Sequence, residues 1–372
     1  MGSPRRLAIF LPGLLGGGAE RIMLNLAQGF AGRGYAVDLV LAQAEGPLMD
    51  QVPESVRLVE LNTTHRKARR TLAGLPALVR YLRREEPDGL LSALNRANLA
   101  AVWAWHLARV PGRVVISEHN TFSVKFQESS GWRTWLMRQM MRSFYPWADA
   151  VTAVSAGVAD DLAQELGMPR ERIEVIYNPV VTPELRTKAQ APLDHPWFQP
   201  GQPPVLLAVG RLTVQKDFPT LIRAFAQVRK TRPVRLLILG EGQDRSGLEA
   251  LATELGLKED VSLPGFVENP YAYMARASVF VLSSRWEGLP TVLIEALCCG
   301  ARLVATDCPS GPREILRDGQ YGKLVSVGDV TALAQAIETT LDDKTARPPR
   351  ESWQPFELEN VVNQYVAMLL GD

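Results

Sequence analysis

The feature that most constrains the fold is a pattern that both halves of the chain repeat: a near-continuous apolar segment, a loop, a helical pattern and a second apolar segment. In the first half the apolar segment 7–12 is followed by a Gly-rich turn, a helical pattern over 19–33 and the apolar segment 36–42. The second half repeats this order over 205–210, 218–230 and 235–240. Uninterrupted apolar strands are typical of a parallel sheet that helices cover on both faces.

Further apolar runs continue the same alternation and predict more parallel strands, over 89–93, 114–118, 150–154, 174–177, 261–264, 278–282, 302–306 and 323–325. The proline-rich stretch 183–204 separates the halves, and we interpret it as a boundary that continues neither a helix nor a central strand. We therefore expect an α/β protein with two Rossmann-like, doubly wound domains over 1–184 and 203–355, whose ligands bind at the carboxyl ends of the strands.

Length and composition agree with two well-filled domains. The chain has 372 residues, of which 46% are hydrophobic and 22% charged, and its net charge is +1. It has no apolar run of the roughly 20 residues that a membrane span needs, and no signal-peptide cleavage region follows the first residues. The three cysteines lack metal-ligand spacing. We expect a cytoplasmic protein with reduced thiols, and neither a motif nor the charge favours a nucleic-acid partner.

The segment 283–297 of the second half carries the strongest functional signal. It follows the apolar run 277–282, so Glu287 is expected on a loop at a strand's carboxyl end, while Pro290 begins a helix that contains Glu295. The free amides of the helix start form an anion seat between the two carboxylates, which suits a nucleotide-sugar. The alternative is that both glutamates are ordinary surface charges. The predicted binding residues here are Gly288, Leu289, Pro290, Thr291, Val292 and Glu295.

A second signal is the pair Arg211 and Lys216, which lies on the loop after the first strand of the second half. Two cations there can neutralise a leaving diphosphate. The chain contains no Asp-x-Asp motif, so we expect fixed cations in place of a metal ion and no cofactor. The alternative is two surface side chains that pack over a loop.

Two segments of the first half also follow predicted strands. Gly16, Gly17 and Gly18 stand before the first helix, where backbone can approach a phosphate or a sugar, although Arg21 occupies the place of the third glycine of a dinucleotide fingerprint. A tight turn explains these glycines as well. His119 ends the strand 114–118, and a purely structural histidine is the alternative there.

The Glu-x7-Glu spacing of Glu287 and Glu295 resembles the signature of retaining glycosyltransferases of family 4, and the resemblance extends along nearly the whole chain. It implies the GT-B fold, in which two Rossmann-like domains face each other across a cleft and the last helix, here 356–372, packs back on the first domain. It also implies that Glu287 contacts the donor sugar, that Glu295 binds the ribose, and that Arg211 and Lys216 hold the donor phosphates.

Other positions match the family in the same way. Gly16 to Gly18 would face the donor, and His119 would hydrogen bond its sugar. Glu241, Phe266 and Val267 would line the nucleotide pocket, although loop residues and a core aromatic are an equally good interpretation of that part. The implied activity is metal-independent, retaining transfer of a hexose or N-acetylhexosamine from a nucleotide-sugar, expected to be UDP-linked. The acceptor would be a glycan or a polyprenyl- or lipid-linked saccharide in cell-surface polysaccharide or glycolipid synthesis.

The acceptor side is less defined. A basic run over 65–70 leads into a stripe of Leu72, Leu75, Leu78, Val79 and Leu82. A second stripe, Trp132, Trp135, Leu136, Met140 and Phe144, is interleaved with Arg133, Arg138 and Arg142. Such helices either lie on the inner face of an anionic membrane or pack against the core with solvated arginines. Both interpretations stay open.

Three other functions compete with transfer. A UDP-sugar epimerase or hydrolase would keep the GT-B fold, and a non-catalytic nucleotide-sugar-binding partner would keep the donor site. An NAD-dependent oxidoreductase is suggested by the Rossmann pattern alone, and the broken glycine fingerprint argues against it.

Overall fold

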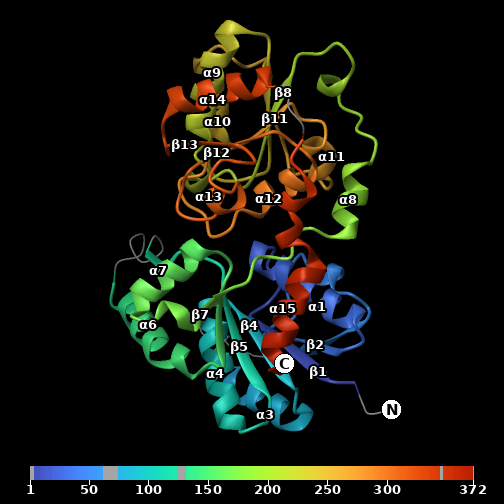
Figure 1. The fold of residues 1–372 in the computed structure, drawn as a ribbon, viewed down its shortest axis with the longest axis vertical. Coiled ribbons are helices and arrows are strands. Elements are labelled where there is room, and N and C mark those ends of the chain that lie inside the picture. Colours follow the sequence, from blue (N-terminus) through green and yellow to red (C-terminus); the bar gives the residue numbers. More distant parts are fainter. Residues whose placement is uncertain (1–3, 62–73, 124–130, 344–346, 372) are drawn as a thin grey trace. The chain divides into compact units, whose positions relative to one another are not determined.

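A computed structural model describes residues 4–61, 74–123, 131–343 and 347–371. The chain divides into two compact units. Unit 1 comprises Met1–Val180 together with Phe356–Asp372, and unit 2 comprises Val181–Pro355. Each unit is built on a parallel sheet with helices around it (Figure 1).

The sheet of unit 1 has the order β3-β2-β1-β4-β5-β6-β7, and every neighbouring pair is parallel. Its strands are β1 (Arg6–Leu11), β2 (Ala36–Leu41), β3 (Val56–Glu60), β4 (Gly89–Ala93), β5 (Arg113–Glu118), β6 (Ala150–Ala153) and β7 (Ile173–Val175). Its main helices are α1 (Gly18–Gly32), α3 (Leu75–Glu85), α4 (Asn95–Ala108), α6 (Trp132–Phe144), α7 (Ala156–Leu166) and α15 (Leu358–Leu370).

The sheet of unit 2 has the order β10-β9-β8-β11-β12-β13 and is also parallel throughout. Its strands are β8 (Val205–Val209), β9 (Arg235–Leu239), β10 (Val261–Gly265), β11 (Val279–Leu282), β12 (Leu303–Thr306) and β13 (Lys323–Val325). Its helices are α8 (Pro183–Ala189), α9 (Phe218–Thr231), α10 (Arg245–Glu254), α11 (Pro270–Met274), α12 (Thr291–Cys298), α13 (Pro312–Ile315) and α14 (Val330–Asp342).

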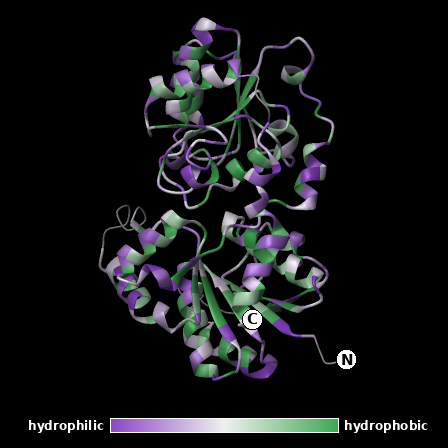
Figure 2. Ribbon diagram, viewed as in Figure 1, coloured by the Kyte–Doolittle hydropathy of each residue, from purple (hydrophilic) through white to green (hydrophobic). Residues whose placement is uncertain are grey.

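The central strands are buried because helices cover both faces of each sheet. Residues Leu7 to Leu11 of β1 and Leu206 to Ala208 of β8 have no exposed surface. Figure 2 shows the strands of both sheets as predominantly hydrophobic, while the helices alternate in character. On α9 the apolar positions recur at helical spacing, and Leu221, Phe225 and Val228 join the core of unit 2. The buried strands and the apolar faces of the helices thus both indicate a sheet that is covered by helices.

In each sheet the strand order reverses direction beside the first strand. β1 lies between β2 and β4, and β8 lies between β9 and β11. The loops that follow β8 and β11 therefore leave the sheet of unit 2 side by side at its carboxyl edge, where open α/β sheets bind their ligands.

The proline-rich stretch 183–204 begins with a short helix. Residues 183–204 belong to unit 2, and Pro183 begins helix α8 after the N-cap Thr182, whose hydroxyl accepts a hydrogen bond from the Leu185 amide. Proline is favoured at the first helical position because its missing N–H would have no partner there. A stretch that continues no neighbouring helix or strand can thus still begin a short helix of its own, and α8 does so here.

Helix α15 at the end of the chain packs against α1, β4 and β5 within unit 1. A β-carbon at Gly29 of α1 would lie 2.5 Å from Val362 Cγ2, so glycine permits the close approach of the two helices. In the described part of the chain, no helix combines the length and the apolar character needed to cross a bilayer. Cys298, Cys299 and Cys308 are free thiols.

Candidate functional site

The predicted residues of unit 2 gather at the carboxyl edge of its sheet. The loop after β8 carries Arg211 and Lys216, and the loop after β11 carries Glu287. The two loops meet because β8 and β11 are neighbouring strands. Residues some 70 positions apart in the chain are thus brought together by the strand order alone.

The carboxylate of Glu287 is buried and held by three side chains. Oε1 accepts hydrogen bonds from Lys216 Nζ and from Ser284 Oγ, each at 2.6 Å, and Oε2 accepts from Gln215 Nε2 at 3.4 Å. Its backbone is fixed too, because its N–H donates to the Pro309 carbonyl and its own carbonyl accepts from a neighbouring amide. A buried carboxylate requires such partners, so Glu287 is not the surface charge that the alternative supposed.

The two cations differ in environment. Lys216 is half-buried, and a β-carbon on Gly210 would lie 3.1 Å from Lys216 Cε, so the glycine that ends β8 leaves room for the lysine side chain. Arg211 is exposed at the surface of the same loop. One cation is therefore held by an ion pair, and the other is exposed to solvent.

Several hydrogen bonds join the two loops and make this edge of unit 2 rigid. Gln215 Nε2 donates to the Trp286 carbonyl at 3.0 Å, and the Arg285 N–H donates to the Gln215 carbonyl at 2.8 Å. Arg285 Nε also lies 3.2 Å from the buried Asp217 carboxylate, which accepts from Thr220 Oγ1 at the start of α9. Neither Gln215 nor Ser284 was predicted, although each stands within three residues of a predicted one.

The start of α12 completes this part of the site. Helix α12 begins at Thr291 and Pro290 is its N-cap, so the proline stands one position before the first helical residue. Leu289 and Pro290 are buried, whereas Thr291, Val292 and Glu295 keep partial exposure. The first amides of a helix have no intrahelical acceptor. Glu287 on the loop and Glu295 within the helix thus have the placement that the sequence predicted.

The remaining positions of unit 2 follow β9 and β10. Glu241 is exposed, and both of its carboxylate oxygens accept hydrogen bonds from Arg245, at 2.6 and 2.9 Å. This pair lowers the pKa of Glu241 below its ordinary value. Phe266 is 74% exposed, and Val267 beside it is partly exposed. The interpretation of Phe266 as a core aromatic was therefore wrong.

In unit 1 the glycine loop follows β1. Gly16 has a φ of +92°, Gly17 is the N-cap of α1, and a β-carbon on Gly18 would meet open space. The Gly17 amide donates to the Glu20 carboxylate at 2.8 Å, so one amide of the loop already has an internal acceptor. Only the remaining amides of this loop can serve an anionic ligand.

His119 follows β5 in unit 1, as predicted. Its ring is half-buried, and Nε2 lies 3.3 Å from Ser117 Oγ, which in turn contacts the Tyr365 hydroxyl of α15 at 3.1 Å. Burial lowers the pKa of His119 to about 4, so the ring is neutral near pH 7. A neutral imidazole can donate or accept one hydrogen bond to a sugar hydroxyl.

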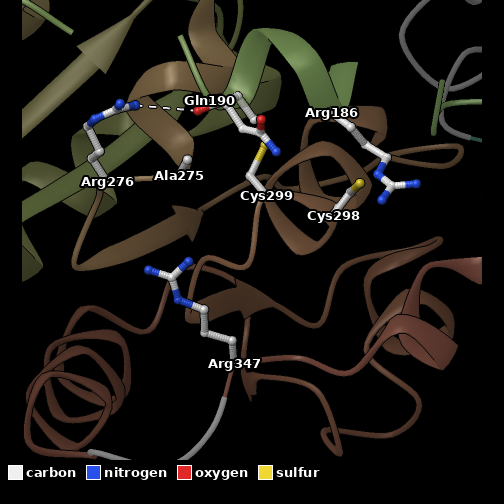
Figure 3. A pocket seen from close by; sticks show the side chains of 8 residues that line it. Arg186, Gln190, Ala275, Arg276, Cys298, Cys299 and Arg347 are labelled. Carbon is white, nitrogen blue, oxygen red and sulfur yellow. Dashed lines mark hydrogen bonds between the residues drawn. The ribbon is translucent and has the colours of Figure 1, made fainter. Parts of the chain in front are cut away.

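A cavity of about 430 Å³ lies elsewhere in unit 2, where helices α8, α11 and α12 end. Figure 3 shows Arg186, Arg276 and Arg347 around it. Arg276 donates to the carbonyls of Ala191 and Ala272, each at 2.9 Å. Arg186 and Arg276 stand at the C-terminal ends of α8 and α11, where arginines neutralise the partial negative charge of the unsatisfied carbonyls, so these two have a structural explanation. It contains none of the predicted site residues.

Comparison with family models and with a known relative shows which family the chain belongs to. The family model described as Glycosyltransferase Family 4 matches residues 16–183, and the model described as Glycosyl transferases group 1 matches residues 193–355. A Campylobacter jejuni protein named N-acetylgalactosamine-N,N'-diacetylbacillosaminyl-diphospho-undecaprenol 4-alpha-N-acetylgalactosaminyltransferase is 32% identical, over 92% of each chain. The chain belongs to the family 4 glycosyltransferases. The predicted family is thereby confirmed.

Other relatives of this glycosyltransferase point the same way. The lipopolysaccharide core biosynthesis glycosyltransferase LpsE of Rhizobium meliloti is 30% identical over 89% of this chain and 87% of its own. Anabaena HepE, solved in complex with UDP and glucose, superposes with a TM-score of 0.75 at 21% identity, over 99% of this chain and all of its own. The predicted GT-B fold is thus confirmed.

The described residues of this glycosyltransferase form no group of three or more His, Cys, Asp or Glu side chains that could hold a metal ion. Independence of metal stays a prediction, and so do the roles of the individual site residues.

Proposed function

We propose that this protein is a retaining, metal-independent glycosyltransferase that moves a hexose or N-acetylhexosamine from a UDP-sugar to a hydroxyl of a lipid-linked or glycan acceptor. The observation that carries the proposal is the carboxylate of Glu287 on the loop that leads into α12, which is buried and paired with Lys216. A carboxylate that can bind sugar hydroxyls and a cation that can bind phosphate thus lie next to each other at one edge of the sheet.

The names of relatives support the choice of substrates. Two Campylobacter jejuni relatives, 32% and 26% identical, are named as N-acetylgalactosaminyltransferases that act on undecaprenol-diphosphate-linked saccharides. An N-acetylhexosamine donor and a polyprenyl-diphosphate-linked acceptor are therefore the first substrates to test.

Each side chain has a proposed task. Glu287 orients the donor sugar through its hydroxyls, and Glu295 binds the ribose. Lys216 and Arg211 stabilise the charge that develops on the diphosphate, aided by the amides of Thr291 and Val292. In unit 1, His119 would hydrogen bond the sugar, and the loop Gly16–Gly18 would contact the donor.

The reaction breaks the bond between the anomeric carbon and the diphosphate oxygen and forms a bond from the same carbon to the acceptor oxygen. The acceptor proton passes to an oxygen of the departing diphosphate, which leaves as UDP. Attack from the face that the leaving group vacates retains the anomeric configuration, and the two cations replace a metal as the source of positive charge.

Calorimetry with UDP, and then with a panel of UDP-sugars, tests the donor site. We expect Glu295→Ala to weaken UDP binding and Lys216→Ala chiefly to lower turnover. Unchanged UDP affinity in Glu295→Ala together with unchanged turnover in Lys216→Ala would overturn the assignment of this site.

Product analysis tests the reaction itself. Mass spectrometry of lipid extracts incubated with donor should detect one added sugar, and NMR of the product should show the anomeric configuration of the donor. Full activity in EDTA is expected. Rapid consumption of UDP-sugar without acceptor would favour the hydrolase or epimerase instead.

A further inference from the structure

Helix α6 of unit 1 exposes a stripe of large apolar side chains. Trp132 is 70% exposed, Trp135 is 62% exposed and Leu136 is 40% exposed. Their spacing of three and four residues places them on one face of the helix. We call these three residues the tryptophan stripe.

The opposite face of α6 is the one that packs. Met141 stands about half a turn around the helix from Trp132 and is fully buried, and the Phe144 ring meets Trp103 of α4 edge-to-face at 5.1 Å between centroids. The helix is therefore held by one face, and none of the three residues of the tryptophan stripe is among its buried residues.

The other candidate stripe behaves differently. On α3, Leu78 and Leu82 are fully buried and Leu75 packs against the same core, so that stripe is an ordinary core-facing one. The basic run over 65–70 and Leu72 lie outside the described residues. The choice that the sequence left open thus has a different outcome on each helix. The stripe of α3 faces the core, whereas α6 exposes Trp132, Trp135 and Leu136 and packs Phe144 of its predicted stripe inward.

The charge of α6 indicates what could cover the stripe. The helix contains three arginines and no acidic residue. Arg133 stacks over the Trp132 ring at 5.5 Å from its centroid. Arg142, also exposed, lies on the other flank of the stripe with its guanidinium beside Gly167, the C-cap of α7. Arg138 donates to the Glu165 carbonyl of α7 at 2.8 Å and lies 3.3 Å from its carboxylate, so it has a partner within unit 1. Tryptophan flanked by arginine suits the interface of an anionic bilayer, where the rings enter the headgroup layer and the cations meet phosphate.

We propose that the tryptophan stripe of α6, with Arg133 and Arg142 beside it, is the surface through which this glycosyltransferase docks on an anionic membrane. The surface deepens the proposed function, because a lipid-linked acceptor would be reached from such a surface. It rests on its own observations, since none of its residues belongs to the donor site.

Co-sedimentation of the full chain with vesicles tests the proposal. Vesicles of phosphatidylcholine alone are compared with vesicles that contain phosphatidylglycerol as well. We expect binding to the anionic vesicles, a partition coefficient about tenfold lower in Trp135→Ser, and one about fivefold lower in Arg133→Gln. The Arg133→Gln effect should shrink in high salt, because screening weakens only the charge term.

The matched control is Leu58→Ser. Leu58 on edge strand β3 is 40% exposed, as Leu136 is, but the strand order puts it at the far edge of the sheet from the strands beside α6. Leu136→Ser should weaken vesicle binding and Leu58→Ser should not. Three results would each overturn the proposal. The first is equal vesicle binding by Leu136→Ser and the wild type, the second is equal binding to both vesicle types, and the third is dimerisation that depends on α6 without vesicle binding.

UDP calorimetry on the same variants separates the two proposals. We expect unchanged UDP affinity in Trp135→Ser and Arg133→Gln. If the wild type does not bind UDP, the proposed function fails and the membrane-docking proposal is unaffected. If the stripe variants bind vesicles like the wild type, the membrane-docking proposal fails and the proposed function is unaffected.

Discussion

Lys216 Nζ lies 2.6 Å from Glu287 Oε1, and the two residues come from loops 71 positions apart in the chain. The family resemblance assigns the lysine to the donor phosphates and the glutamate to the donor sugar, and the structure pairs the two side chains with each other. An ammonium group has three N–H donors, and this carboxylate takes one. The lysine can therefore bind a diphosphate and keep its ion pair.

The coupling within this pair can be measured. Lys216→Met leaves a buried carboxylate short of a partner, and Glu287→Gln leaves a half-buried cation, so each single change should lower the free energy of unfolding by about 1–3 kcal/mol. The double variant should lose less than the sum of the singles by about 1–2 kcal/mol. Urea denaturation of the wild type, the two single variants and the double variant measures these free energies. If the losses of the single variants simply add in the double variant, the two side chains have no coupling energy.

Ser284 acts as a positioning residue for Glu287. Its hydroxyl donates to Oε1 at 2.6 Å, and a hydrogen bond to a charged group contributes about 1.5–3 kcal/mol. Ser284→Ala should therefore lower both stability and turnover. Ser283→Ala is the matched control, because the Ser283 hydroxyl is equally buried but donates to the backbone carbonyl of Lys216 at 2.7 Å. We expect the two variants to have similar stability and kcat to fall more in Ser284→Ala than in Ser283→Ala. Equal kcat values in the two variants would show that Ser284 does not position Glu287.

The sequence predicts the backbone of this protein better than its side-chain contacts. Near-continuous apolar strands require covered parallel sheets, so most strands could be located from the sequence. Edge strand β3 was missed because Val56 is its only buried residue, which leaves a weak apolar signal. Pro183 was assigned to a linker because proline interrupts a helix but also begins one, and composition does not separate the two cases.

Residue types at strand ends were sufficient to place Glu287, Lys216 and His119 at the carboxyl ends of their strands. The hydrogen-bond partners of Glu287 could not be predicted. Ser284 and Gln215 are of residue types common in loops, and Gln215 reaches Glu287 only because β8 and β11 are neighbouring strands. The exposure of Phe266 and of the tryptophan stripe was also beyond the sequence, since an aromatic residue after a strand or on a helix can face either way.

The acid sensitivity of unit 1 should depend on His119. The pKa of a histidine is ordinarily 6.5, and burial lowers that of His119 to about 4 in the folded protein. The unfolded chain therefore takes up the proton first, and the stability that neutral His119 contributes is complete above about pH 6.5 and is lost as the pH falls toward 4. His119→Gln should reduce the loss of unfolding free energy between pH 7 and pH 5 by about 1–2 kcal/mol. Chemical denaturation at both pH values measures this, and parallel losses in the two proteins would contradict the lowered pKa.

A substitution at Phe266 should change UDP affinity without changing the stability of the fold. Its ring is 74% exposed, so Phe266→Ser removes almost no core contact, and the free energy of unfolding should change by less than about 0.5 kcal/mol. If the ring stacks on the nucleotide base, UDP affinity should fall about tenfold or more, because a base stacked on an aromatic side chain gains about 1–3 kcal/mol. Val327→Ser is a suitable control, since Val327 is an exposed apolar residue of unit 2 that follows β13 and was not assigned to the site. Calorimetry with UDP on both variants decides the matter, because a Phe266→Ser protein that binds UDP like the wild type would remove this residue from the nucleotide pocket.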